Sequence, residues 1–133
     1  MFSRTAKYAI MALTELAAGD RSLKIRELAQ AAGIPQPFLA KLIPPLVQAG
    51  IITSTRGKRG GLAFAHPPEE ISLAETIRAV KGDRLMLDCP FSLTPCGGQE
   101  DCPLAPLWDP VRQKIVAFLE ATSLAQVAKR RKR

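Results

Sequence analysis

Along residues 2–18 the apolar positions repeat every three or four residues, a spacing that places them on one face of a helix. The members of this stripe are Ala6, Ala9, Ile10, Leu13 and Ala17. Lys7, Thr14 and Glu15 lie off the stripe, and the dipeptide Gly-Asp at 19–20 breaks the pattern. The spacing therefore predicts an amphipathic first helix.

Two shorter amphipathic helices follow, with a tight turn between them. The first covers residues 23–33 and ends at Gly33, since glycine readily adopts the left-handed conformation that closes a helix. The next begins at Pro37, because proline suits the first position of a helix. Pro44 and Pro45 lie inside this helix and predict a kink, because proline has no N–H to donate.

A glycine-rich hexapeptide, RGKRGG, separates two β-prone runs at 51–55 and 62–65. Its glycines permit the positive φ angles that a hairpin turn needs. The pattern predicts a two-stranded hairpin with a basic tip. Two short helices followed by such a hairpin are typical of a winged helix-turn-helix, which places its second helix in the major groove of DNA.

The remainder of the chain predicts further helices. Ser72 and Glu75 have the spacing of a reciprocal capping box at the start of a fourth helix, which ends at Gly82. Apolar residues at helical spacing mark another helix near 106–121, and SLAQ at 123–126 resembles a second capping box. The predicted fold class is therefore mostly α with a small β wing, within a single domain.

The distribution of charge along the chain indicates a binding partner. Nineteen Lys and Arg against twelve Asp and Glu give a net charge of +7, concentrated in RGKR at 56–59 and KRRKR at 129–133. Clustered basic charge indicates a polyanion, and with the helix-turn-helix pattern it indicates double-stranded DNA. The basic tail at 129–133 is expected to be disordered and to follow phosphates without reading bases. No run of about 18 apolar residues lacks a charge, so a membrane span is excluded and a cytoplasmic protein is expected.

Five residues are the candidate DNA contacts, and a solvated polar surface is the alternative for each of them. Gln36 and Lys41 lie at or near the start of the predicted recognition helix, where glutamine can read adenine and lysine can read guanine. Arg56, Lys58 and Arg59 lie on the hairpin tip, where cations can enter a narrow minor groove.

The three cysteines of the chain, Cys89, Cys96 and Cys102, fall within one stretch rich in proline and glycine. Their odd number argues against a disulfide framework, and the C-x2-C pairs usual for zinc are absent. Iron-sulfur clusters accept looser spacing, so the stretch indicates a cluster, with a loop of incidental cysteines as the alternative. Without a C-x-x-C motif or a histidine near the cysteines, an enzyme is not expected.

The sequence resembles the Rrf2 family of bacterial transcription regulators, whose members include iron-sulfur sensors of the IscR and NsrR kind. The resemblance rests on KYAIMAL, on IRELAQAAGIPQPFLAKL, on AGIITSTRGKRGGLAFAHPPEEISLAE, on the three cysteines and on PLW. It implies a homodimer formed through a long helix, and a cluster, [2Fe-2S] rather than [4Fe-4S], with Cys89, Cys96 and Cys102 as ligands. The expected organisation is a winged helix-turn-helix at 1–66, a fourth helix and cluster loop at 67–104, a dimerisation helix at 105–128 and a basic tail at 129–133.

The sequence departs from the family pattern at positions that matter for the cluster. No histidine follows the third cysteine, and the residue before Tyr8 is Lys7 rather than an acidic residue. The only histidine, His66, is expected on the surface. The fourth ligand is therefore unknown, and the nearby carboxylates that could serve are Asp88, Glu100 and Asp101. A regulator that responds to thiol oxidation or zinc without a cluster is the alternative.

A second departure concerns DNA. The glutamate common in the family's recognition helix is replaced by Ala40, so the operator cannot be carried over from the family.

Overall fold

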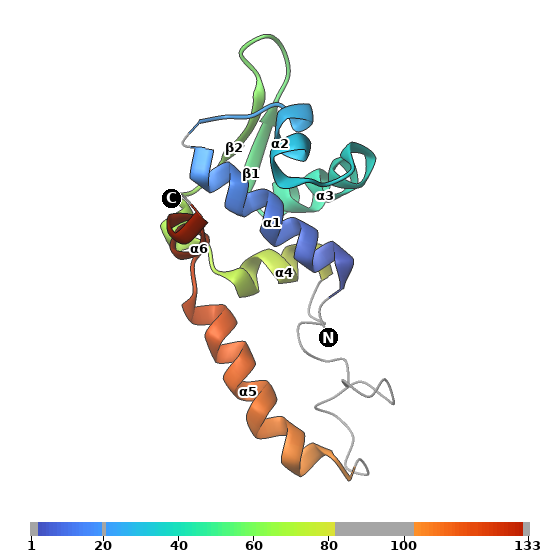
Figure 1. Ribbon diagram of the computed structural model, residues 1–133, viewed down its shortest axis with the longest axis vertical. Helices are drawn as coiled ribbons and strands as arrows, with labels where there is room; N and C mark the ends of the chain where they lie inside the picture. The colour runs from blue at the N-terminus through green and yellow to red at the C-terminus, as the bar shows by residue number, and fades with distance from the viewer. Residues whose placement is uncertain (1–2, 20, 82–102, 132–133) are drawn as a thin grey trace.

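The computed structural model describes residues 3–19, 21–81 and 103–131 (Figure 1). These residues form six α-helices, one short 3-10 helix and a two-stranded antiparallel sheet. In chain order the elements are α1 (Arg4–Gly19), α2 (Ile25–Ala32), α3 (Gln36–Gln48), β1 (Ile52–Thr55), β2 (Gly61–Phe64), η1 (Pro68–Glu70), α4 (Leu73–Lys81), α5 (Ala105–Ala121) and α6 (Leu124–Arg131). The mostly α fold with a small β hairpin is confirmed. Within this part of the chain, no helix is both long and apolar enough to cross a membrane.

Helix α1 is the centre of the core, and α2, α3, α4 and α6 all pack against it (Figure 1). Its buried positions include Ala6, Ala9 and Ala12, whose small side chains let the neighbouring helices approach closely. Thr14, expected off the apolar stripe, is buried as well. Its hydroxyl donates to the carbonyl of Ile10 at 2.7 Å, so the polar group is satisfied inside the core.

The helix-turn-helix forms as the sequence predicts. Gly33 closes α2 with φ 69°, and the next N–H, that of Ile34, donates back to the carbonyl of Ala29 at 3.0 Å. Helix α3 then continues through the Pro44-Pro45 pair to Gln48, so the prolines do not end it, and the kink expected at them stays a prediction.

An aromatic contact attaches the recognition helix to the core. Phe38 near the start of α3 packs edge-on against Tyr8 of α1, with ring centroids 4.9 Å apart, and both residues are partly buried against the core.

The hairpin pairs β1 with β2 from Ile52 opposite Phe64 to Thr55 opposite Gly61. A third segment joins its edge, because Leu23 and Leu62 exchange two backbone hydrogen bonds of 3.0 and 2.6 Å. This attachment fixes the turn end of β2 to Leu23, two residues before α2 begins.

The C-terminal region expected at 105–128 contains two helices, and they divide at the SLAQ segment that resembles a second capping box. Helix α5 ends at Ala121, and Ser123 caps α6 with a complete capping box: its N–H donates to Gln126 at 2.7 Å, and its hydroxyl accepts from the Gln126 N–H at 3.1 Å. The break arises because Ser72 and Ser123 form a β-bridge, in which the N–H of Leu73 donates to the carbonyl of Thr122 at 2.9 Å.

Three residues of the basic tail differ from the expectation of disorder, while Lys132 and Arg133 lie outside the described residues. Lys129, Arg130 and Arg131 are the last residues of α6, which packs against α1 with Leu124 and Ala128 buried.

Candidate nucleic-acid interface

Helix α3 presents one polar side to solvent. Leu39, Leu42 and Leu46 are buried, whereas Gln36 and Lys41 are exposed. At 100° per residue, these two polar side chains flank the exposed arc of the helix at its N-terminal half. The structure thus places both predicted reading residues on the free side of α3.

The tip of the wing is a tight glycine-containing turn. Gly57 has φ 101°, and its carbonyl accepts a hydrogen bond from the N–H of Gly60 at 3.0 Å. Arg56, Lys58 and Arg59 are exposed around this turn, and among the described residues none of them forms an ion pair. Their charges are available to an external polyanion.

A cavity of about 450 Å³ lies between α2, α3 and the wing. Ala40 and Pro44 line it from α3, Ile25 from α2, and Thr55 and Arg56 from the wing. Its walls are mostly apolar. The recognition helix α3 and the wing therefore form the two sides of one groove.

Lys24 is a residue of this region that the sequence reasoning missed. It precedes α2 at the N-cap position, and its ammonium donates a hydrogen bond to the carbonyl of Gly57 at 2.9 Å. The available signal was a lysine where Ser, Thr, Asp or Asn is preferred. Next to it, the pKa of Glu27 is lowered, first by the hydrogen bond from the Lys24 backbone N–H and then by the Arg21 guanidinium 3.6 Å away.

The predicted cluster ligands Cys89, Cys96 and Cys102 lie outside the described residues, as do the carboxylates Asp88, Glu100 and Asp101 and the predicted helix end at Gly82. Among the residues that are described, no group of three or more metal-binding side chains occurs. His66 is exposed, as expected.

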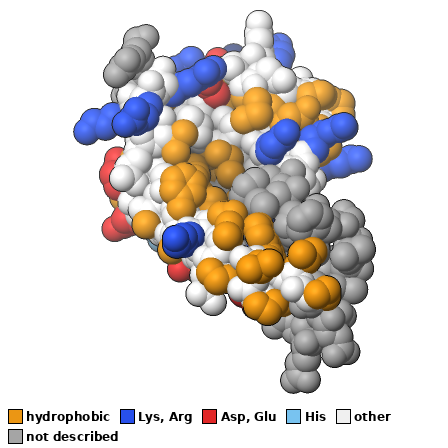
Figure 2. All heavy atoms as spheres, turned by 60° about the horizontal axis from the view of Figure 1, so that its bottom comes forward, with side chains coloured by type: hydrophobic (Ala, Val, Ile, Leu, Met, Phe, Trp, Pro, Cys, Tyr) orange, Lys and Arg blue, Asp and Glu red, His pale blue; other side chains and the backbone are white. Residues whose placement is uncertain are grey.

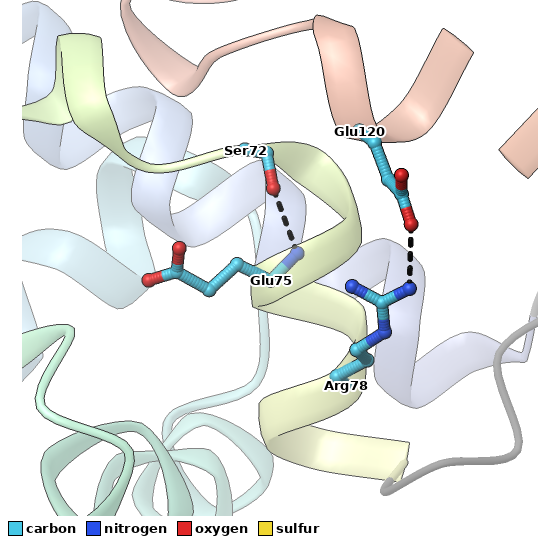
Figure 3. A network of polar contacts seen from close by, with 4 residues as sticks. All are labelled: Ser72, Glu75, Arg78 and Glu120. Carbon is cyan, nitrogen blue, oxygen red and sulfur yellow. Dashed lines mark hydrogen bonds and ion pairs between the residues drawn. The ribbon is translucent and has the colours of Figure 1, made fainter. Parts of the chain in front are cut away.

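The elements on either side of that segment, α4 and α5, are joined by an ion pair. Arg78 of α4 points toward Glu120 of α5, with Nη2 2.8 Å from Oε1 (Figure 3). Ser72 caps α4 by accepting from the Glu75 N–H at 3.0 Å, while the Glu75 carboxylate points away from Ser72. The capping box predicted here is therefore half formed.

Helix α5 extends away from the rest of the molecule and buries only Leu119 (Figure 1). Leu107, Val111 and Phe118 are 75%, 47% and 58% exposed. Figure 2, which looks onto this end of the molecule, shows hydrophobic side chains gathered there. Exposed apolar area of this kind marks a contact surface.

Near the start of α5, three buried side-chain atoms have no hydrogen-bond partner among the described residues. They are Trp108 Nε1, Asp109 Oδ1 and Arg112 Nε, of which the last two form an ion pair 3.5 Å long that lacks hydrogen-bond geometry.

Together, two helices joined by a tight turn and a hairpin with a cationic tip define the class of winged helix-turn-helix proteins. The comparisons with known proteins narrow this class. The family model for Rrf2, described as an iron-dependent transcriptional regulator, matches residues 2–130. The chain belongs to the Rrf2 family of transcriptional regulators, which are DNA-binding proteins and not enzymes.

Three relatives illustrate the range of this family. A protein of Aquifex aeolicus named as an HTH-type transcriptional regulator is 33% identical over 93% of this chain and 88% of its own length. The transcriptional repressor NsrR of Streptomyces coelicolor is 30% identical over 77% of this chain and 65% of its own. The solved structure of CymR, the global cysteine regulator of Bacillus subtilis, superimposes with a TM-score of 0.80 at 26% identity, covering 98% and 97% of the two chains.

Proposed function

We propose that this regulator binds double-stranded DNA as a homodimer, with α3 in the major groove and the wing on the adjacent backbone or minor groove. The observation that supports this most is the position of the five candidate residues. Gln36 and Lys41 on α3, and Arg56, Lys58 and Arg59 on the wing, are all exposed on the two elements that flank one groove. Phosphate contacts from the wing would position the protein, and contacts from α3 would read bases.

The test is the salt dependence of binding to an operator selected from random DNA. Each lost phosphate contact lowers the slope of log affinity against log salt by about 0.9. The double variant Arg56→Ala/Arg59→Ala should therefore bind more weakly, with a slope flatter by roughly one to two units. Arg4→Ala/Lys7→Ala removes two exposed cations from α1 and is the matched control. Equal slopes for the wing variant and the wild type would exclude the wing from the interface.

The homodimer is proposed to form through α5. Three large apolar side chains of this helix are exposed at spacings of four and seven residues, which places them on one side of it. A second copy of the same helix can cover this stripe, in an isologous contact of the kind most homodimers use. Phe118→Ser with Leu107→Ser should yield monomers in sedimentation experiments, whereas Val47→Ser, an exposed apolar residue of α3, should not. A dimer that survives both α5 substitutions would contradict this interface.

The regulatory signal is proposed to act through an iron-sulfur cluster held by Cys89, Cys96 and Cys102, [2Fe-2S] rather than [4Fe-4S]. The three cysteines are of the right chemical type, since thiolates are the usual ligands of such clusters. They provide three of the usual four ligands. When bound, a cluster would supply a centre that reacts with oxygen or nitric oxide. The chain itself supplies the three thiolates and the two helices, α4 and α5, that flank them in the sequence.

A cluster-free regulator that senses thiol oxidation or zinc is the second candidate, because the third cysteine is followed by no histidine and the fourth ligand is unassigned. Anaerobic reconstitution separates the two. We expect the wild-type protein to show visible absorbance and to contain stoichiometric sulfide. Cys96→Ala should lose most of the absorbance and most of the sulfide while it remains a dimer. A colourless protein that binds zinc, or a full chromophore in Cys96→Ala, would reject the cluster.

A further inference from the structure

Lys24 occupies a position that its own helix does not favour. It is the N-cap of α2, where the side chain normally accepts hydrogen bonds from free backbone N–H groups. An ammonium group has no acceptor, and a cation at a helix N-terminus is opposed by the helix dipole. The capping here is provided by Glu27, whose Oε1 accepts from the Lys24 backbone N–H at 2.9 Å. The lysine side chain is therefore not explained by α2.

The side chain instead reaches the wing. Its Nζ donates to the carbonyl oxygen of Gly57, 33 residues further along the chain, at 2.9 Å. The same oxygen accepts the N–H of Gly60 at 3.0 Å, the bond that closes the turn at the tip. Lys24 thus contacts a carbonyl that also closes the turn at the wing tip.

This contact is the second of two attachments between the wing and the start of α2. The first is the pair of backbone hydrogen bonds between Leu23 and Leu62, one residue from the turn end of β2. The Leu23–Leu62 bonds hold strand β2 but do not hold the turn beyond it, whereas the Lys24 bond to the Gly57 carbonyl holds the turn itself. Lys24 also lines the cavity between α3 and the wing, so it lies on the side of the groove.

Electrostatics argue that the contact serves an external partner. Lys24 brings a fourth cation beside Arg56, Lys58 and Arg59, which costs free energy unless a polyanion is present. The carboxylate of Glu27 is engaged by the Lys24 backbone and by Arg21, and no described carboxylate pairs with the Lys24 ammonium. A neutral donor would fix the tip at lower cost if the fold alone required the contact.

We propose that Lys24 is a positioning residue that holds the wing tip against the helix-turn-helix, so that Arg56 and Arg59 meet DNA already in place. An arrangement fixed before binding loses less conformational entropy on binding and therefore binds more tightly. The inference rests on the proposed DNA-binding function.

The first measurement needs no DNA. Lys24→Met keeps the aliphatic stem and removes the donor, while Arg26→Met removes one exposed cation from the same helix and is the matched control. Amide hydrogen exchange at Gly60 should accelerate about threefold or more in Lys24→Met, with the midpoint of thermal unfolding unchanged, and should stay at the wild-type rate in Arg26→Met. Unchanged exchange in Lys24→Met would overturn the attachment, whether or not the protein binds DNA.

The second measurement is a double-mutant cycle on operator affinity. Lys24→Met should weaken binding about three- to tenfold with the wing intact, and less than about twofold in the Arg56→Ala/Arg59→Ala background, because it acts through those side chains. An equal loss in both backgrounds would mean an independent phosphate contact and would overturn the positioning role. If Gly60 exchanges faster in Lys24→Met but the wild-type protein binds no operator, the attachment of the wing tip stands, the proposed DNA-binding function is wrong, and the role of Lys24 in DNA binding is rejected with it.

Discussion

Replacing Gly60 with alanine is expected to open the wing tip and leave the helical core folded. A Cβ atom at this position would lie 2.6 Å from both the carbonyl carbon and the carbonyl oxygen of Arg56, and it would also meet the carbonyl oxygen of Thr55. All three are backbone atoms, so no side-chain rotation relieves the overlap. The turn between β1 and β2 must therefore change its path.

The magnitude follows from the bonds that the turn would lose. The N–H of Gly60 gives up its 3.0 Å bond to Gly57, and the neighbouring 3.3 Å bond from the Gly61 N–H to Thr55 Oγ1 is disturbed. At about 0.5–1.5 kcal/mol per hydrogen bond, the free energy of unfolding should fall by about 1–2 kcal/mol. For a domain of this size that lowers Tm by roughly 4–8 °C. DNA binding should also weaken, because all three tip cations lose their positions. The slope of log affinity against log salt should therefore flatten by about two to three units.

Two other glycines provide the controls. Gly19→Ala places its Cβ 3.8 Å from Leu23 Cδ1, an ordinary contact, and should change neither Tm nor binding. Gly57→Ala meets no atom within 4 Å but has φ 101°, so it should lose a similar free energy of unfolding, about 1–2 kcal/mol, through backbone strain without the overlap. The assays are thermal unfolding by circular dichroism and fluorescence anisotropy on labelled operator over a range of salt. A Gly60→Ala protein with the wild-type affinity and salt slope would refute the reasoning.

Three further predictions concern charge. Removing either partner of the Arg78–Glu120 pair should lower the free energy of unfolding by less than about 1 kcal/mol in urea titrations, because both side chains are about half exposed; a loss above about 2 kcal/mol would contradict this. The pKa of Glu27 is lowered by the hydrogen bond from the N-cap backbone N–H, so its contribution to stability is present at neutral pH and lost as the pH falls through its folded pKa. Glu27→Gln should therefore be less stable than the wild type at neutral pH, and the difference should disappear as the pH falls through that pKa. Lys129→Ala with Arg130→Ala should weaken binding to all DNA sequences about equally, and a loss confined to the operator would show that α6 contributes to specificity.

The features that the sequence predicted well depend on near neighbours in the chain. Gly33 ends α2, and Ser123 and Gln126 cap α6, because each of these signals involves residues no more than about four apart. The wing follows from the same logic, since the glycines of its turn define where the two strands meet. For the candidate interface, the sequence placed its five residues on the recognition helix and the wing tip, and the structure leaves all of them exposed.

The features that were missed depend on contacts between distant parts of the chain. The bridge from Ser72 to Ser123 joins the start of α4 to the start of α6, and the helical state of Lys129, Arg130 and Arg131 depends on the packing of α6 against α1. The buried position of Thr14 needs helices on both sides of α1. Lys24 joins the wing only because the hairpin folds back over α2. Hydrophobic period and composition contain none of this information.

The most direct test of the account is the affinity of one sample for one operator before and after its chromophore is removed. The protein is reconstituted with iron and sulfide without oxygen, titrated onto an operator selected from random DNA, and titrated again after nitric oxide has bleached it. The account predicts a change of about tenfold or more in Kd, which is the size of a typical coupling between two sites. The same comparison in Cys96→Ala should give no change. Equal affinities for the loaded and bleached wild-type protein would contradict regulation through the cysteines.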